Sequence, residues 1–241
     1  MGRSSDVLAH PKVVQQPRID LDKPILGQLH KLKDLDDNVW LYDAWIHRPT
    51  RIKPEFFESA VAEHLTKVRW WAVPLIWLPV AGICLSSAVT DIGMMAAGYL
   101  AAVGMVLWQM IEYTLHRFMF HWNPQTLAGI YVHFLFHGCH HKFPQDVERL
   151  VFPPFPAACI AAGIYSVLLA VSPTVPHALA IFSGIIFGYV VYDCCHYGIH
   201  SGWIRNRLSK HHMRHHHLDD TKNFGISSPL IDYILGSLYV A

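Results

Sequence analysis

The chain has 241 residues, of which 52% are hydrophobic and 15% are charged, and its formal net charge at pH 7 is +1. Soluble domains average about 25% charged residues, so this composition indicates a membrane protein. The near-zero net charge gives no sign of a nucleic-acid partner. The unusual feature is the set of 18 histidines, almost as many as the 19 lysines and arginines together.

The first part of the chain is polar and contains Pro11, Pro17 and Pro24. We expect residues 1–35 to form a flexible tail and residues 36–241 to form a single membrane domain. Residues 36–66 mix aromatic with charged side chains, a pattern typical of a segment that lies on a membrane surface. The first 60 residues contain no apolar core of the kind that a secretory signal peptide has.

Four apolar stretches follow, at residues 70–89, 92–111, 151–171 and 178–192. About 20 apolar residues span a bilayer as a helix. The first two stretches are long enough and the third is adequate. The fourth is short, and we count it as a span because it pairs with the third. The sequence therefore predicts an all-α integral membrane protein with four transmembrane helices in two hairpins.

The distribution of basic residues predicts the orientation of these spans. No Lys or Arg occurs between Trp70 and His116, or between Leu150 and Ile204. All the basic residues then lie on one side of the membrane, which the positive-inside bias assigns to the cytosol. Both ends of the chain fall on this side, and so do the histidine clusters described next.

Four histidine clusters follow the ends of the second and fourth spans. Two of them have the pattern H-x-x-H-H, whose positions i, i+3 and i+4 share one face of a helix, and one is an i, i+4 pair. In the remaining cluster, two histidines five residues apart would be splayed by about 140° on an α-helix. We expect the helix to end near Pro124, so that the second of them can swing back. The clustered histidines are His116, His121, His137, His140, His141, His196, His200, His212, His215 and His216.

Ten converging imidazoles indicate two metal ions, because one metal seldom takes more than six ligands. A single histidine is more often an ordinary surface or core residue, but four such clusters within about 100 residues are poorly explained in that way. Imidazole suits zinc, copper, nickel and iron, and no thiolate set is present. Of these, iron is the usual choice for activating dioxygen, so we expect two iron ions with O₂ as co-substrate. Zinc could replace iron in a purified protein, since it binds such sites more tightly than Fe²⁺.

Several neighbouring side chains could support the metal ligands. Glu112 lies one turn before His116, and Asp193 lies three residues before His196, so each carboxylate could accept the second ring N–H of a ligand. Their alternative role is a helix cap or a surface charge. We expect no catalytic residue beyond the metal ligands themselves. The candidate supporting residues are Glu112, His133, Asp193, His211, Asp219 and Asp220.

The flanking residues carry a family resemblance. The segments His133-Phe-Leu-Phe-His137-Gly-Cys-His140-His141, Tyr192-Asp193 and Asn223-Phe-Gly-Ile-Ser227 resemble the fatty acid hydroxylase superfamily of membrane di-iron oxygenases. Within it they are most similar to the fatty acid 2-hydroxylases of sphingolipid synthesis. The resemblance covers about residues 35–241. Only His10-Pro11 is present of the haem motif His-Pro-Gly-Gly that longer members carry, so the chain resembles the short form without a cytochrome b5 domain.

The resemblance implies an activity and partners. It implies O₂-dependent hydroxylation at C2 of a long or very long acyl chain, free or in ceramide, in the endoplasmic reticulum membrane. It also implies cytochrome b5 and its reductase as the electron donors. Arg205, Arg207 and Lys210, with Trp203, could form the docking surface, or they could contact lipid headgroups instead.

Three alternatives remain open at this point. A desaturase or sterol oxidase would use the same histidine-rich site and would differ in its product. A metal transporter would need polar ligands inside the spans, which contain almost none. An inactive scaffold would be expected to have lost part of the ligand set.

Overall fold

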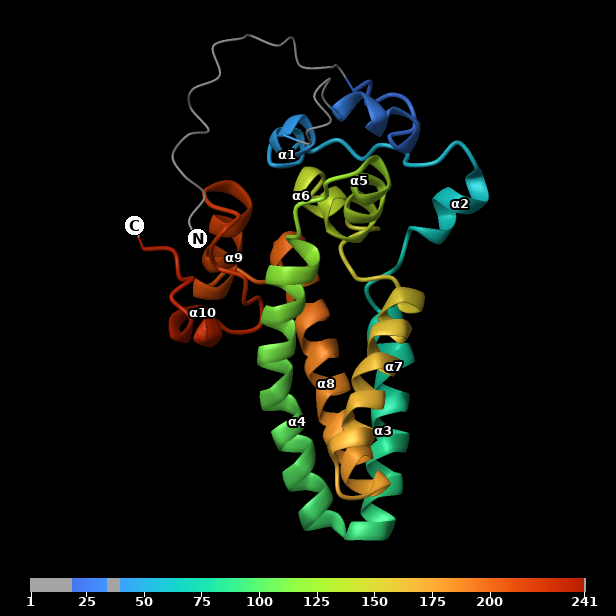
Figure 1. Cartoon of the computed structure of the whole chain (residues 1–241), viewed down its shortest axis with the longest axis vertical. Helices are drawn as coiled ribbons and strands as arrows, with labels where there is room; N and C mark the ends of the chain where they lie inside the picture. Colours follow the sequence, from blue (N-terminus) through green and yellow to red (C-terminus); the bar gives the residue numbers. More distant parts are fainter. Residues whose placement is uncertain (1–18, 34–39, 241) are drawn as a thin grey trace.

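The computed structural model describes residues 19–33 and 40–240, and all regular elements in these ranges are helical. Four long helices form an elongated bundle, with shorter helices gathered at one of its ends (Figure 1). The long helices are α3 (Ala72–Ile92), α4 (Met94–Thr114), α7 (Pro154–Val171) and α8 (Val175–His200). All four are long and apolar enough to cross a membrane, which confirms the predicted spans.

Helix α8 is the centre of the bundle. Two thirds of its most apolar window is buried inside the protein, against about a fifth for the other three helices, whose apolar surfaces are left for lipid. It is also longer than the short span expected at residues 178–192, because it continues unbroken through His196 to His200. The central helix of the bundle therefore carries two histidines of the site at its end.

Small residues allow α4 and α8 to cross closely. A β-carbon on Gly184 would lie 1.9 Å from the Ala101 carbonyl oxygen, and one on Gly104 would lie 2.0 Å from the Ile181 carbonyl oxygen. Gly184 and Gly188 form a G-x-x-x-G pair, the spacing that lets membrane helices approach. Gly93, with φ of 80°, makes the tight turn between α3 and α4 at the far end of the bundle.

The cap of short helices lies at the end of the bundle where α4 and α8 finish (Figure 1). In chain order it contains a 3₁₀ helix (Leu26–Leu32), α1 (Trp40–Ile46), α2 (Ala60–Leu65), a π-helix (Leu115–Phe120), α5 (Leu127–His133), a second π-helix (Phe134–Gly138), α6 (Cys139–Lys142), α9 (Arg207–His217) and α10 (Leu230–Ile234). Helix α9 begins with a capping box, in which Asn206 and Ser209 bond reciprocally.

The N-terminal segment differs from the expected flexible tail. Leu29 and Leu32 of the 3₁₀ helix and its N-cap residue Ile25 are fully buried, and they pack in one apolar core with Tyr42 and Phe56. Residues 19–33 therefore belong to the cap. The cause is the apolar side chains of this stretch, which the polar and proline-containing composition of the first 35 residues did not reveal. The remainder of the expected tail, residues 1–18 and 34–35, lies outside the described residues.

The segment expected to lie on the membrane surface divides into two parts. Helix α1 packs inward, with Tyr42 and Ile46 buried, whereas α2 leaves Val61 and Leu65 more than 70% exposed. Residues 36–39 lie outside the described part of the chain. An exposed apolar face close to the spans suits contact with the lipid interface.

Candidate metal centre

The first histidine pair is brought together by a π-helix. After Thr114 the backbone of α4 widens, and the amide of His121 bonds to the carbonyl of His116 at 3.1 Å. This i to i+5 bond returns the chain to the same face after five residues, whereas an α-helix would splay the pair. The helix does end at His121, as predicted, but the π-helical turn before it is what brings His121 to the same face as His116.

A second π-helix precedes the first H-x-x-H-H motif. It covers Phe134–Gly138, and the α-helical geometry resumes at Cys139. Gly138 is required here, since a β-carbon would lie 2.4 Å from the Tyr42 hydroxyl. That hydroxyl is bonded at 2.7 Å to Nδ1 of the buried His133. His133 thus holds the Tyr42 side chain against this turn. It is not a member of either histidine group described below.

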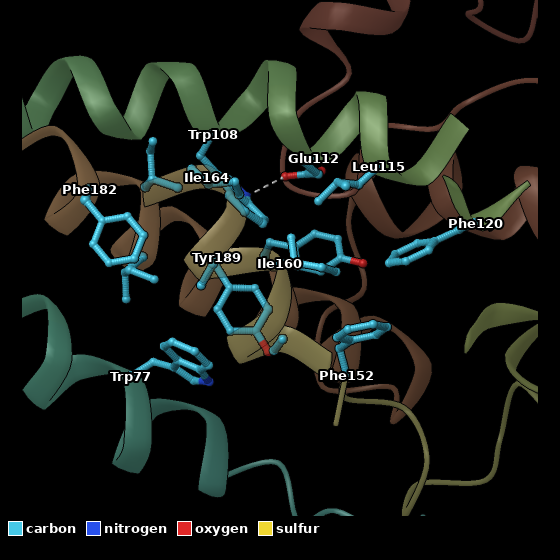
Figure 2. A pocket seen from close by; sticks show the side chains of 15 residues that line it. Trp77, Trp108, Glu112, Leu115, Phe120, Phe152, Ile160, Ile164, Phe182 and Tyr189 are labelled. Atoms are coloured by element: carbon cyan, nitrogen blue, oxygen red, sulfur yellow. Dashed lines mark hydrogen bonds between the residues drawn. The ribbon is translucent and has the colours of Figure 1, made fainter. Parts of the chain in front are cut away.

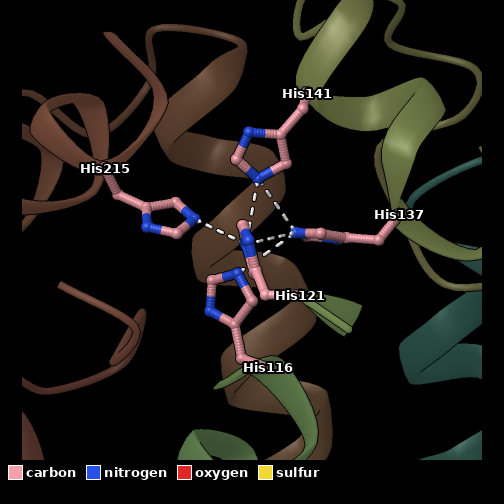
Figure 3. Close-up of side chains that lie close together, drawn as sticks. All are labelled: His116, His121, His137, His141 and His215. Carbon is pink, nitrogen blue, oxygen red and sulfur yellow. Dashed lines mark hydrogen bonds between the residues drawn. The ribbon is translucent and has the colours of Figure 1, made fainter. Parts of the chain in front are cut away.

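All ten clustered histidines converge at the cap end of the bundle, in two groups of five. The first group takes one histidine pair from the π-helix (Leu115–Phe120) that continues α4 and from its C-cap, shown with its partners in Figure 3. The second group takes the pair from the end of α8. Within each group the facing nitrogens all lie within 4.8 Å of one another. Site 1 consists of His116, His121, His137, His141 and His215, and site 2 consists of His140, His196, His200, His212 and His216.

Each H-x-x-H-H motif is divided between the two sites. His137 and His141 belong to site 1, and His140, between them in sequence, belongs to site 2. In α9 the division is reversed, because His212 and His216 belong to site 2 and His215 to site 1. The sites are therefore interlocked, and each draws its histidines from three segments of the chain.

The spacing within each group fits a metal ion. His121 Nε2 lies 3.2 Å from Nε2 of His137 and of His141, and 2.9 Å from Nε2 of His215. Two nitrogens that bind one ion at about 2.1 Å, at angles of about 90° to 110°, are roughly 3.0–3.4 Å apart. Five imidazoles that share one centre cannot all be satisfied by bonds to each other, since a neutral ring has one donor and one acceptor. The donor set suits a cation.

The protonation state also favours a metal. Burial, and then the neighbouring imidazoles, hold the pKa values of His121, His140 and His212 well below the usual value for histidine. Burial has the same effect on the pKa values of His215 and His216. Neutral imidazole is the form that binds metals, so both groups are suitable for a dimetal site.

Backbone carbonyls accept hydrogen bonds from the second ring nitrogen of several of the histidines. His116 Nδ1 lies 2.5 Å from the Phe224 carbonyl oxygen, and His196 Nδ1 lies 3.2 Å from the carbonyl oxygen of Leu150. His215 Nδ1 lies 2.7 Å from the carbonyl oxygen of Lys222. A bond of this kind holds the proton on Nδ1 and leaves the Nε2 lone pair facing the site.

The prediction that Glu112 and Asp193 bond directly to a histidine of the site is wrong. Glu112 bonds to backbone amides of Ile226 and Ser227, and Asp193 to the amide of Phe152, so neither touches the ligand on its own helix. The reason is that each carboxylate points from its helix toward a neighbouring loop.

Of the other candidate supporting residues, only Asp220 approaches a histidine of the two groups. Asp219 bonds to Thr221 in the turn after α9, whereas its neighbour Asp220 approaches His121 Nδ1 at 3.9 Å. His211 bonds to Asp232 at 3.1 Å. Asp232 is fully buried and was not predicted as a supporting residue. It lies far in sequence from every histidine cluster, so the sequence did not indicate its contact with His211.

A cavity opens beside both sites. Its wall includes His137 of site 1, His140 and His196 of site 2, and the aromatic residues Phe120, Phe152 and Tyr192. The same three aromatic residues line a second, apolar cavity that lies between α3, α4, α7 and α8 (Figure 2). The cavity beside the histidine sites thus adjoins apolar space between the spans, with the three aromatic side chains at the boundary.

These features define a class: a membrane protein with four spanning helices and two adjoining five-histidine sites suited to a pair of metal ions. Within that class the chain belongs to the fatty acid hydroxylase family, whose family model, Fatty acid hydroxylase, matches residues 101–237.

Characterised relatives match nearly the whole chain. It is 41% identical to dihydroceramide fatty acyl 2-hydroxylase FAH2 of Arabidopsis thaliana, over 94% of this chain and 95% of that protein. It is 37% identical to ceramide very long chain fatty acid hydroxylase SCS7 of Saccharomyces cerevisiae, over 91% of this chain and 58% of the relative. A solved structure described as full length scs7p, with only the hydroxylase domain visible, matches with a TM-score of 0.86 and 35% identity, over 94% of this chain and 87% of that one.

Proposed function

We propose that this chain is a fatty acid 2-hydroxylase that acts on acyl chains of ceramide-type lipids. The observation that carries the proposal is the junction between the two histidine sites and the apolar cavity among the spans. The relatives' names support the reaction and the substrate class. We also propose that residues 36–241 form the membrane hydroxylase domain, as the family resemblance implies, together with the cap residues 19–33 that pack against it.

The ten histidines would hold two iron ions, and these, when bound, supply the reduction of O₂ and the insertion of one oxygen atom at C2. The chain's own residues position the substrate. An acyl chain that lies between Trp77, Trp108 and Ile164 in the apolar cavity would pass Phe120 and Phe152 with its polar end toward the histidines. The aromatic walls would exclude water from that space.

The wall of the cavity near the sites favours a neutral head over a free carboxylate. Arg149 lines this cavity, but its guanidinium is paired with both Glu63 and Asp146. Glu63 also pairs with Lys67 at 3.1 Å. Since two carboxylates already satisfy Arg149, this side chain offers no uncompensated charge to a fatty acid anion. An amide-linked acyl chain carries no charge at this point.

The reaction needs two electrons and two protons from outside the substrate, since one atom of O₂ leaves as water. The sequence has no G-x-G-x-x-G turn for a flavin or nicotinamide. We therefore propose membrane cytochrome b5, reduced by its reductase, as the donor. The proposed docking surface for this acidic partner consists of exposed residues, Arg205 just before α9 and Arg207 and Lys210 in its first turn. The location would be the endoplasmic reticulum, with the cap in the cytosol.

Reconstitution tests the proposed function. The iron-loaded protein, with the donor, its reductase and NADPH, should convert a dihydroceramide to its 2-hydroxyacyl form, identified by mass spectrometry, and the rate should fall as salt rises. Formation of a double bond instead would favour a desaturase. Faster turnover of a free fatty acid than of dihydroceramide would contradict the proposed substrate class, and full activity without donor or reductase would contradict the proposed partners.

A further inference from the structure

Glu112 of α4 is buried, and four donors converge on it. Its Oε1 accepts from the amides of Ile226 and Ser227 at 2.6 and 2.8 Å. Its Oε2 accepts from Trp108 Nε1 at 3.1 Å and from the Ser227 hydroxyl. A carboxylate can accept all four bonds, whereas an amide offers only one acceptor oxygen. The side chain therefore fixes the loop around residues 224–227 against α4.

The same loop also bonds to the π-helix that continues α4, one turn after Glu112. The Phe224 carbonyl, two residues before Ile226, accepts from Nδ1 of His116. Glu112 and His116 are thus linked through the loop, without touching each other. The buried Asp232 holds the other side of this loop, because it accepts from the amides of Phe224 and Gly225 at 2.9 and 2.7 Å.

Asp193 of α8 repeats the arrangement at the second site. It is 1% exposed and accepts from the amide of Phe152 at 3.0 Å and from the Tyr189 hydroxyl at 3.1 Å. Two residues before Phe152, the Leu150 carbonyl accepts from Nδ1 of His196, which lies on α8 one turn after Asp193. At both sites a buried carboxylate therefore accepts hydrogen bonds from amides of a loop. A carbonyl of the same loop accepts a hydrogen bond from a histidine one turn after the carboxylate.

We propose that Glu112 and Asp193 are positioning residues, each specific for one site: Glu112 orients His116 of site 1 through Phe224, and Asp193 orients His196 of site 2 through Leu150. The bond at Nδ1 fixes the tautomer and the ring plane of the ligand. Other histidines lack this support, since Nδ1 of His140, His141, His212 and His216 has no hydrogen-bond partner among the described residues. His116 and His196 would then be the ligands whose orientation is fixed before the metal binds.

The inference rests on the metal-binding role proposed above, and metal retention tests it apart from activity. Protein purified with a tag that contains no histidine is depleted of metal, loaded with Fe²⁺ without oxygen, and challenged with a chelator that leaves two ions on the wild type. Loss of outer support typically weakens metal binding by about 10- to 100-fold. Glu112→Ala and Asp193→Ala should therefore each retain one ion, and the double variant none.

Combination with ligand variants shows which site is lost. His141→Ala with His215→Ala removes site 1, and His212→Ala with His216→Ala removes site 2. Adding Glu112→Ala to the first pair should leave one ion, and adding it to the second pair should leave none. Asp193→Ala should show the opposite pattern, so each carboxylate is the matched control for the other. A merely structural role would weaken both sites in both variants.

The conservative variants keep the test valid if an alanine variant does not fold. Glu112→Gln and Asp193→Asn retain one acceptor oxygen, and should lose the same single ion at a higher chelator concentration than the alanine variants. Two ions retained by every carboxylate variant, or one ion lost from the same site in both, would overturn the inference alone. A wild type that does not bind two ions would overturn the proposed function as well.

Discussion

At the scale of single residues, the division of each H-x-x-H-H motif follows from helix geometry. On an α-helix the first and last of these histidines are about 40° apart, while the middle one is about 100° from the last. In α9 this directs His212 and His216 toward site 2 and His215 toward site 1. The convergence of all ten residues could be predicted from spacing, but their division could not, because it depends on which partner segments lie on either side of α9.

Loss of one histidine should stop the reaction. We expect His140→Ala or His215→Ala to lower 2-hydroxylation by more than about 100-fold, since each removes a ligand outright, and even residues behind the ligands are worth about 10- to 100-fold. Mass spectrometry of lipids from cells that express each variant measures this. His30→Ala is the control, because His30 is exposed in the cap, and it should retain wild-type activity. Full activity of the His140 variant would remove that residue from the site.

The buried histidines should also make the metal-free protein acid-sensitive. Burial lowers the pKa values of His121, His140, His212 and His216 well below the usual value in the folded state. Unfolding returns them to about 6.5, so below that pH the unfolded state binds more protons. Stability should be constant above about pH 7 and fall as the pH drops below 6.5, by up to about 1.4 kcal/mol per pH unit for each histidine. Thermal melts of the metal-free protein in detergent between pH 5 and 8 measure this, and a flat profile would contradict it.

At the scale of elements, the two π-helices could not be predicted from the sequence. The four spans could be predicted from apolar length, but Leu115–Phe120 and Phe134–Gly138 carry no local pattern that distinguishes a π-helix from an α-helix. Their wider turn depends on the packing around His116 and on the close approach of Tyr42 to Gly138. The 3₁₀ helix (Leu26–Leu32) was missed for a related reason, since its burial depends on contacts with Tyr42 and Phe56.

The crossing of α4 and α8 gives a prediction about stability. Gly184→Val should clash with the Ala101 backbone and destabilise the protein by about 1–3 kcal/mol or more, as overpacking does. Gly163→Val on α7 is the matched control, because nothing lies within 4 Å of the position that its β-carbon would occupy. Melting temperatures of both variants in the same detergent provide the comparison. Equal melting temperatures would show that this crossing does not limit stability.

At the scale of the whole molecule, the histidine sites lie at one end of the bundle and both hairpin turns at the other (Figure 1). The one-sided Lys and Arg distribution predicts that the cap end faces the cytosol. In this orientation the proposed iron ions and the proposed reductant would reach the protein from the same side, and the proposed lipid substrate would enter between the spans. The fold thus places the two histidine groups beside apolar space between the spans.

Orientation can be measured in sealed microsomes. An epitope tag at the C-terminus should be removed by added protease, because the cap is expected outside the vesicle. The same tag inserted after Ser172, in the turn between α7 and α8, should be protected until detergent is added. A protected C-terminal tag, with a digested tag at Ser172, would reverse the proposed orientation.

The metal content of the purified protein tests the central claim, two interlocked five-histidine sites, most directly. Protein carrying a tag without histidine and loaded with Fe²⁺ should contain close to two ions per chain. His141→Ala with His215→Ala takes residues from different motifs but from one site, so it should retain one ion, as should His212→Ala with His216→Ala. The variant with all four changes should retain none. A wild-type value near one, or two ions retained by either double variant, would contradict the account.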